Sequence, residues 1–138
     1  MTLRYLVLAV GLWLGASAAL AIMPSGQQAT QTAPEQPGDA ARGKLVFERR
    51  CTGCHALDAN REGPQLRTVF GRKAGSVADF KYSASVARLG LTWNPETLDR
   101  WLMDPDAMAP GNDMSFATPK AADRRDLIAY LQQVADGK

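Results

Sequence analysis

The 138-residue sequence contains few of the side chains that bind metals or form crosslinks, with only two cysteines and one histidine. A structural zinc site needs four ligands, so these three residues do not complete one by themselves. Charge is nearly balanced at +2, which gives a nucleic-acid role no electrostatic support. The sequence also lacks internal repeats and an alternating strand pattern, so repeat architectures and β-sheet folds are not predicted.

The long uncharged run in this sequence lies at its N-terminus. Residues 1–21 combine a short basic start, an apolar centre and a small-residue end, the layout of a secretory signal peptide cleaved before Ile22. The alternative is an uncleaved membrane anchor reaching to about residue 23, because the 19 residues from 5 to 23 are just long enough to span a bilayer. Either way the remainder is predicted to be exported, and any membrane contact is predicted to be through this segment alone.

The rest of the chain divides into a tail and one domain. Residues 22–38 are rich in Pro, Gln, Thr and Ala and are predicted to form a disordered tail or tether. Residues 39–138 are predicted to form a single all-α domain. Its helices are expected over residues 40–50 and 84–89, from Pro95 to before Pro105, and from an opening at Thr118 and Pro119. Their apolar faces are expected to hold Leu45, Val46 and Phe47; Leu98, Trp101 and Leu102; and Leu127, Tyr130, Leu131 and Val134.

Two long segments of the domain, 57–77 and 104–118, are predicted to be loops because glycine, proline and charged residues interrupt them. The predicted helices alone make a thin core. A long loop without structure of its own is reasonable in a compact domain if it wraps a group that is not protein.

Residues 49–57, RRCTGCHAL, bring both cysteines and the histidine together as Cys51-x-x-Cys54-His55. A thioredoxin-like redox pair would lie near a βαβ pattern, which is absent. A structural disulfide suits an exported protein, but it would close a very small loop and leave His55 unexplained. The remaining interpretation uses all three residues. Both thiols form thioethers with the same haem, and His55 is an axial ligand of its iron. The spacing therefore predicts one covalently attached haem c, which would also fill the thin core.

Further residues carry a resemblance to a known family. In order, they are Gly43 and Phe47 before CTGCH, Gly63-Pro64 with Leu66, FGRKAG at 70–75, FKYS at 80–83, Trp93 with PETL, Pro110-Gly111 with Met114, and DLIAYL at 126–131. With these pieces the domain resembles the small class I c-type cytochromes, the mitochondrial-like cytochromes c and their bacterial relatives. The resemblance implies the class I cytochrome c fold, a few helices and long loops wrapped around one haem.

The second axial ligand is expected to be a methionine, because thioether sulfur is a soft ligand suited to haem iron. Met103 ends a predicted helix, whereas Met108 and Met114 both lie in the predicted loop 104–118. Residue type alone does not separate these two, since methionine is more often core filler than ligand. The resemblance implies Met114, which follows Pro-Gly-x-x, and leaves Met108 as the alternative.

Four other site residues are implied by the resemblance. Arg72, Tyr82 and Trp93 match residues that hold the buried haem propionates, and their N–H and O–H groups are suitable donors for a buried carboxylate. Without the resemblance, Tyr82 and Trp93 would be interpreted as core aromatics and Arg72 as a solvated charge. Pro64 matches the residue whose backbone carbonyl accepts a hydrogen bond from the proximal histidine, His55 here, which would orient that ring.

The sequence departs from the mitochondrial pattern near the expected haem. Trp101 stands where those proteins carry a tyrosine that donates towards the methionine sulfur, and Val86 stands where an asparagine is usual. A ring of lysines around the haem edge is also missing. Acidic residues in the ligand loop and arginines elsewhere predict a docking face of mixed sign instead: Asp104, Asp106 and Asp113, with Arg49, Arg50 and Arg61.

The sequence therefore predicts a monohaem electron carrier rather than an enzyme. The expected location is the periplasm or the periplasmic face of the bacterial inner membrane, and a monomer is expected. Expected partners are a quinol-oxidising cytochrome complex, a terminal oxidase, a dehydrogenase or a photosynthetic reaction centre. The alternative function is a haem peroxidase or gas-binding protein whose sixth ligand is labile, which needs an open iron site. A subunit of a larger oxidoreductase is a third possibility.

Overall fold

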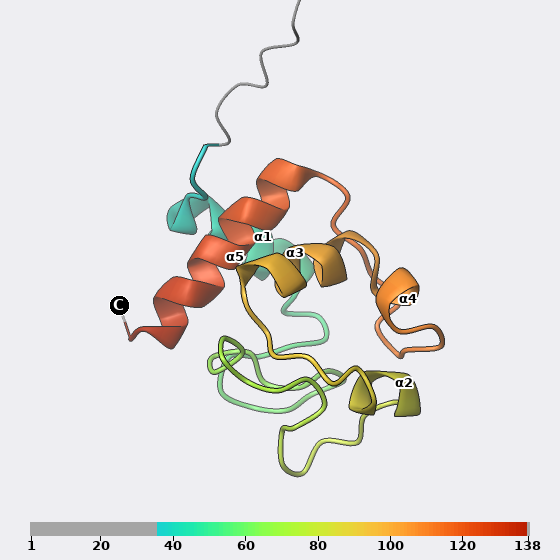
Figure 1. The fold of residues 1–138 in the computed structure, drawn as a ribbon. Helices are drawn as coiled ribbons and strands as arrows, with labels where there is room; N and C mark the ends of the chain where they lie inside the picture. The colour runs from blue at the N-terminus through green and yellow to red at the C-terminus, as the bar shows by residue number, and fades with distance from the viewer. Residues whose placement is uncertain (1–35, 138) are drawn as a thin grey trace, which may run out of the picture. The chain divides into compact units, whose positions relative to one another are not determined.

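The computed structural model describes residues 36–137, within which five helices and no strand form (Figure 1). In chain order these are α1 (Ala40–Arg50), α2 (Ala84–Ala87), α3 (Pro95–Met103), α4 (Pro105–Met108) and α5 (Ala121–Ala135). The all-α prediction is confirmed. Across residues 36–137, no helix has the length and apolar character needed to cross a membrane. The predicted signal segment and residues 22–35 of the predicted tail lie outside the described residues.

Helices α1 and α5 pack against each other, and α1 passes behind α5 in Figure 1. The buried face of α1 consists of Gly43, Val46 and Phe47, which recur at i, i+3 and i+4. A Cβ atom on Gly43 would overlap the backbone carbonyl of Asp126 on α5, so glycine is what allows the two helices to approach so closely. Leu45 lies off this face and is 51% exposed, so its prediction as a core residue is wrong.

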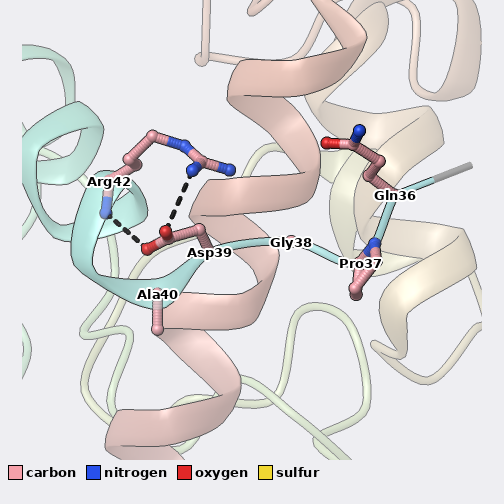
Figure 2. A pocket seen from close by; sticks show the side chains of 6 residues that line it. All are labelled: Gln36, Pro37, Gly38, Asp39, Ala40 and Arg42. Atoms are coloured by element: carbon pink, nitrogen blue, oxygen red, sulfur yellow. Dashed lines mark hydrogen bonds and ion pairs between the residues drawn. The ribbon is translucent and has the colours of Figure 1, made fainter.

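The start of α1 is tied to α5 by a group of charged side chains. Asp39 caps α1 by accepting hydrogen bonds from the backbone N–H groups of Ala41 and Arg42. Figure 2 shows the Asp39 carboxylate between the backbone and guanidinium of Arg42, beside a shallow hollow that holds none of the predicted site residues. The same guanidinium donates through Nε to Oδ2 of Asp126 at 2.7 Å. This hydrogen bond holds the pKa of the Asp126 carboxyl below its usual range.

Helix α3 begins as its sequence indicates and carries buried residues for the core. Asn94 and Thr97 form a reciprocal capping box, and Pro95 occupies the first helical position. The predicted apolar residues of this helix, Leu98, Trp101 and Leu102, are all buried. They meet Leu127, Ile128 and Leu131 of α5 in one hydrophobic cluster. Ile128 was missed because it lies beside, rather than on, the expected stripe.

The remaining helix boundaries differ from the predictions. Helix α2 ends at Ala87 instead of 89, three residues before Gly90, which adopts a positive φ of 65°. The predicted loop 104–118 contains α4, whose first turn is capped by the Asp104 carboxylate. Helix α5 starts at Ala121, two residues after Pro119. Each difference involves about one turn of helix, and local side-chain contacts determine whether such a turn forms.

The predicted loop 57–77 contains no helix and is held in place by backbone hydrogen bonds to distant segments. Leu66 N donates to Ala56 O at 3.1 Å, which closes the loop behind the Cys-x-x-Cys-His segment. At the other end, Trp93 N donates to Arg72 O at 2.9 Å, so two predicted site residues become neighbours. Figure 1 shows these loops (green) below α1, α3 and α5, and the site lies between the loops and the helices.

Candidate haem site

One cavity of about 300 Å³ brings the predicted site residues together. All eight line it: Cys51, Cys54, His55, Pro64, Arg72, Tyr82, Trp93 and Met114. Much of the remaining lining is apolar: Leu66, Val69, Val86, Leu98, Leu102, Leu127 and Leu131. A water molecule needs only about 15 Å³ of such space, so this is no ordinary packing defect. The cavity suits a large, mainly apolar ligand.

The two cysteines and the histidine reach the cavity because α1 ends there. Cys51 is the C-cap residue of α1, and Cys54 N and His55 N both donate to Cys51 O, at 3.1 and 2.8 Å. This tight turn presents all three side chains to the cavity. Burial raises the pKa of the Cys51 thiol to about 11, so the free thiol is protonated at neutral pH.

The ring of His55 has a defined orientation. Its Nδ1 lies 2.8 Å from the backbone carbonyl of Pro64, which can only accept a hydrogen bond, so Nδ1 carries the proton. Burial lowers the pKa of His55, which favours the neutral ring with an unprotonated Nε2. Gly63 packs so closely on this ring that a Cβ atom there would overlap it. The neutral imidazole therefore has a free nitrogen lone pair, as a metal ligand requires.

Arg72 provides the test of whether the cavity fits a haem. Arg72 donates through Nη1 to Gln65 O at 3.0 Å, but its buried Nε has no hydrogen-bond partner among the described residues. Burial removes water from around this guanidinium and so lowers its pKa. A buried N–H donor without a partner is costly, and a ligand carboxylate would satisfy it. The residues present fit a haem: an apolar cavity with a cationic donor at its side, two thiols and a neutral histidine.

Met114 also lines the cavity, whereas Met108 packs against the hydrophobic core and is not among the lining residues. The sulfur of Met114 accepts a hydrogen bond from Trp101 Nε1 at 3.1 Å. The tryptophan that departs from the mitochondrial pattern thus still supplies a donor to the methionine sulfur. Trp101 is itself held edge-on against Trp93, with ring centroids 5.5 Å apart. Val86, the second departure, presents an apolar side chain to the cavity.

Two lining residues were missed by the sequence analysis. Asn112 accepts a hydrogen bond from Met114 N at 2.8 Å and donates to Ala109 O at 3.1 Å. It therefore braces the loop immediately before Met114. Phe116 lines the cavity and is 39% exposed, which places a large aromatic ring at the surface. The sequence signal that could have identified them is their distance from Met114: Asn112 lies two residues before it and Phe116 two residues after it.

The alternatives for the two cysteines gain no support from the structure. Cys51 and Cys54 are free thiols and form no disulfide. Among residues 36–137 there is no group of His, Cys, Asp and Glu side chains arranged to hold a metal ion directly. No fourth ligand for zinc therefore accompanies the Cys-x-x-Cys-His segment.

Comparisons with known proteins point to one family for this chain. The family model described as "Cytochrome c" matches residues 40–135. The chain is 42% identical over 102 residues to "Cytochrome c" of Cochliobolus lunatus, covering 71% of this chain and 94% of that protein. It is 45% identical over 96 residues to "Cytochrome c-type cyt cy" of Rhodobacter capsulatus, covering 68% of this chain and 48% of that protein. Among solved structures, cytochrome cH from Methylobacterium extorquens matches with a TM-score of 0.66 and 40% identity, covering 70% of this chain and 99% of that one.

Proposed function

The chain belongs to the cytochrome c family of electron-transfer proteins, and we propose that it carries single electrons between redox proteins at a bacterial cell membrane. It is a monohaem cytochrome c, and Cys51 and Cys54 fit the haem-attachment motif of that family. When bound, the haem supplies the one-electron couple. The proposal concerns the roles of the other site residues, the partners and the location.

The observation that carries this proposal is that His55 and Met114 line the same cavity from two distant segments of the chain. We propose that His55 Nε2 and Met114 Sδ would bind the iron of the haem. With two protein ligands the iron would have no site for substrate, and the haem would supply one-electron transfer with little rearrangement. Pro64 fixes the His55 ring, and Arg72, Tyr82 and Trp93 are proposed to hold the haem propionates.

Replacing Met114 with alanine tests whether this residue closes the iron to added ligands. We expect the wild-type protein to be low-spin and not to bind carbon monoxide. Met114→Ala should bind carbon monoxide readily because the sixth position is open. The visible spectra of ferric and ferrous protein, with and without carbon monoxide, measure this. Met108→Ala is the matched control, since Met108 does not line the cavity. Ready binding by the wild type would contradict the proposal and favour the peroxidase or gas-binding alternative.

The hydrogen bond from Trp101 to the Met114 sulfur should raise the reduction potential, because it draws electron density from a ligand and so disfavours the ferric state. We expect Trp101→Phe to lower the potential by up to about 40 mV, the one-electron equivalent of a net hydrogen bond of about 1 kcal/mol. Redox titration measures the shift, and Trp101→Tyr should recover part of it by returning a donor. An unchanged potential in Trp101→Phe would show that the hydrogen bond does not affect the iron.

The charges at the cavity support a docking face of mixed sign, and they include two of its predicted members, Arg50 and Asp113. Arg50, Lys81, Glu62 and Asp113 line the cavity. Of the other predicted charges, Asp104 caps α4, and Asp106 accepts from the backbone N–H of Gly111 at 3.3 Å. A mixed face steers a partner less strongly than one of a single sign.

For partners, we propose a quinol-oxidising cytochrome complex, a terminal oxidase, a periplasmic dehydrogenase or a reaction centre. The location proposed is the periplasm, with residues 1–21 as signal peptide or anchor and 22–38 as tether. Two findings support this: the signal-like sequence, and the similarity to cytochrome cy of Rhodobacter capsulatus and cytochrome cH of Methylobacterium extorquens. If the N-terminus is an anchor, the tether would let the domain move between membrane partners.

A further inference from the structure

The segment that carries Met114 is held by different contacts on its N-terminal and C-terminal sides. On the N-terminal side, Asn112 bonds both Met114 N and Ala109 O. On the C-terminal side, residues 115–117 are exposed. The next buried residue is Thr118, which is 1% exposed and whose N–H donates to Leu102 O at 2.6 Å. The position of Met114 on this side therefore depends on what holds Thr118.

A buried arginine on α5 holds that position. Arg124 is 6% exposed, and its Nη1 donates to the backbone carbonyls of Thr118 at 3.0 Å and Pro119 at 2.8 Å. These are the residues at which the loop 104–118 joins the segment leading to α5. A planar guanidinium can contact two adjacent carbonyls while its other nitrogens remain available, which a lysine ammonium cannot do with the same geometry.

The same guanidinium is fixed from its other side by α3. Arg124 Nε donates to Asp99 Oδ1 at 2.7 Å, and Nη2 approaches Asp99 Oδ2 at 3.4 Å. A buried charge without a partner is costly, so Asp99 makes it possible to place Arg124 beneath the loop. Asp99, Arg124 and the carbonyls of Thr118 and Pro119 thus connect α3, α5 and the end of the ligand loop. We call this group the loop clamp.

We propose that Arg124 is a positioning residue for Met114, acting through Thr118 and Pro119, and that Asp99 holds Arg124 in place for this role. The inference rests on the proposed function, because it requires Met114 to be the sixth ligand. Three residues separate Met114 from Thr118, and the four steps between their Cα atoms span at most about 14 Å when extended. Release of Thr118 from the clamp frees this short segment, so Met114 leaves the cavity more often and the iron is exposed for longer.

The test uses the intact haem protein and compares Arg124→Lys with the wild type. We expect carbon monoxide to bind Arg124→Lys about tenfold to a hundredfold faster, as follows from the loss of one or two charge-assisted hydrogen bonds that oppose loop opening. The far-red ferric band that reports sulfur-to-iron ligation should weaken in parallel. If Arg124→Lys does not fold, Asp99→Asn tests the same clamp and should change both readouts in the same direction.

General destabilisation must be separated from the clamp, and Asp126→Asn provides the matched control. Asp126 also lies on α5 and pairs with an arginine, but it binds Asp39 and Arg42 rather than the ligand loop. Asp126→Asn should lower the stability of the protein and leave carbon monoxide binding within about twofold of the wild type, the spread expected for sites that do not couple. Equal rates in Arg124→Lys and Asp126→Asn, after matching for stability, would overturn the proposal.

Two further measurements distinguish failure of the clamp from failure of the proposed function. If Met114→Ala leaves the spectrum unchanged, Met114 is not a ligand, and the clamp proposal falls with that assignment. If Met114→Ala allows carbon monoxide to bind the iron while Arg124→Lys behaves like the control, only the proposal about the loop clamp is wrong. Hydrogen exchange at the Thr118 amide reports the opening of the loop independently of the iron. This amide should exchange faster in Arg124→Lys than in Asp126→Asn.

Discussion

The double variant Cys51→Ala/Cys54→Ala will run without haem on a denaturing gel and will lose most of its folded structure. Both thiols line the cavity, and no other cysteine exists in the chain to replace them. At roughly 24 cal/mol per Å³, an empty cavity of 300 Å³ corresponds to a cost of roughly 7 kcal/mol. Small domains are stable by only about 5–15 kcal/mol, so this domain should depend on its haem to fold. Haem staining and far-ultraviolet circular dichroism measure the two effects.

Gly53→Ala is the control for this experiment. Gly53 lies between the two cysteines, and a Cβ atom there would meet nothing within 4 Å, so both thiols remain in place. This variant should retain covalent haem and fold normally. Each single cysteine variant keeps one thiol and should give a lower yield of attached haem. Full haem retention by the double variant would disprove attachment through Cys51 and Cys54.

Gly43→Val will destabilise the protein by about 3 kcal/mol or more, at the upper end of what overpacking a core costs. Its Cβ atom would overlap the Asp126 carbonyl and lie 2.8 Å from Tyr130 Cβ, so α1 and α5 would have to separate. Separation would also weaken the contact between the rings of Phe47 and Tyr130, whose centroids are 5.4 Å apart. The midpoint of denaturant unfolding, with the slope checked against the wild type, measures the loss.

Ala41→Val measures the effect of a valine in α1 at an exposed position. Ala41 lies on the same helix and is exposed, so valine there should lower the helix propensity by only about 0.5 kcal/mol. If Gly43→Val lost no more stability than Ala41→Val, the close approach of α1 and α5 would not depend on glycine.

Local spacing predicted the haem-attachment part of the candidate site, and the resemblance to a known family implied the other residues. The Cys51-x-x-Cys54-His55 segment has few chemical interpretations, and Pro-Gly-x-x-Met distinguished Met114 from Met108 once the resemblance was stated. The starts of α1 and α3 were also predictable, because Asp39 and the Asn94-Pro95 pair act on backbone groups within three residues of themselves.

Interactions between distant segments could not be predicted in the same way. A tryptophan at position 101 signals an altered polar network, but only the fold shows that its N–H points at the Met114 sulfur. Asp104 and Asp106 were predicted as docking charges, and only the fold shows that both also accept hydrogen bonds from backbone N–H groups. Leu45 looked like a core residue, but it is exposed, because α1 buries the face formed by Gly43, Val46 and Phe47 instead.

By itself, the sequence determined the attachment motif, the helical class and the starts of its main helices, because each depends on groups only a few residues apart. Only the tertiary structure decided how Arg124 is used. Its partners Asp99, Thr118 and Pro119 lie 25, 6 and 5 residues away, and the pairing with Asp99 arises because α3 packs against α5. A charge is tolerated in the interior only where such packing supplies its partners, and sequence spacing does not record which segments will meet.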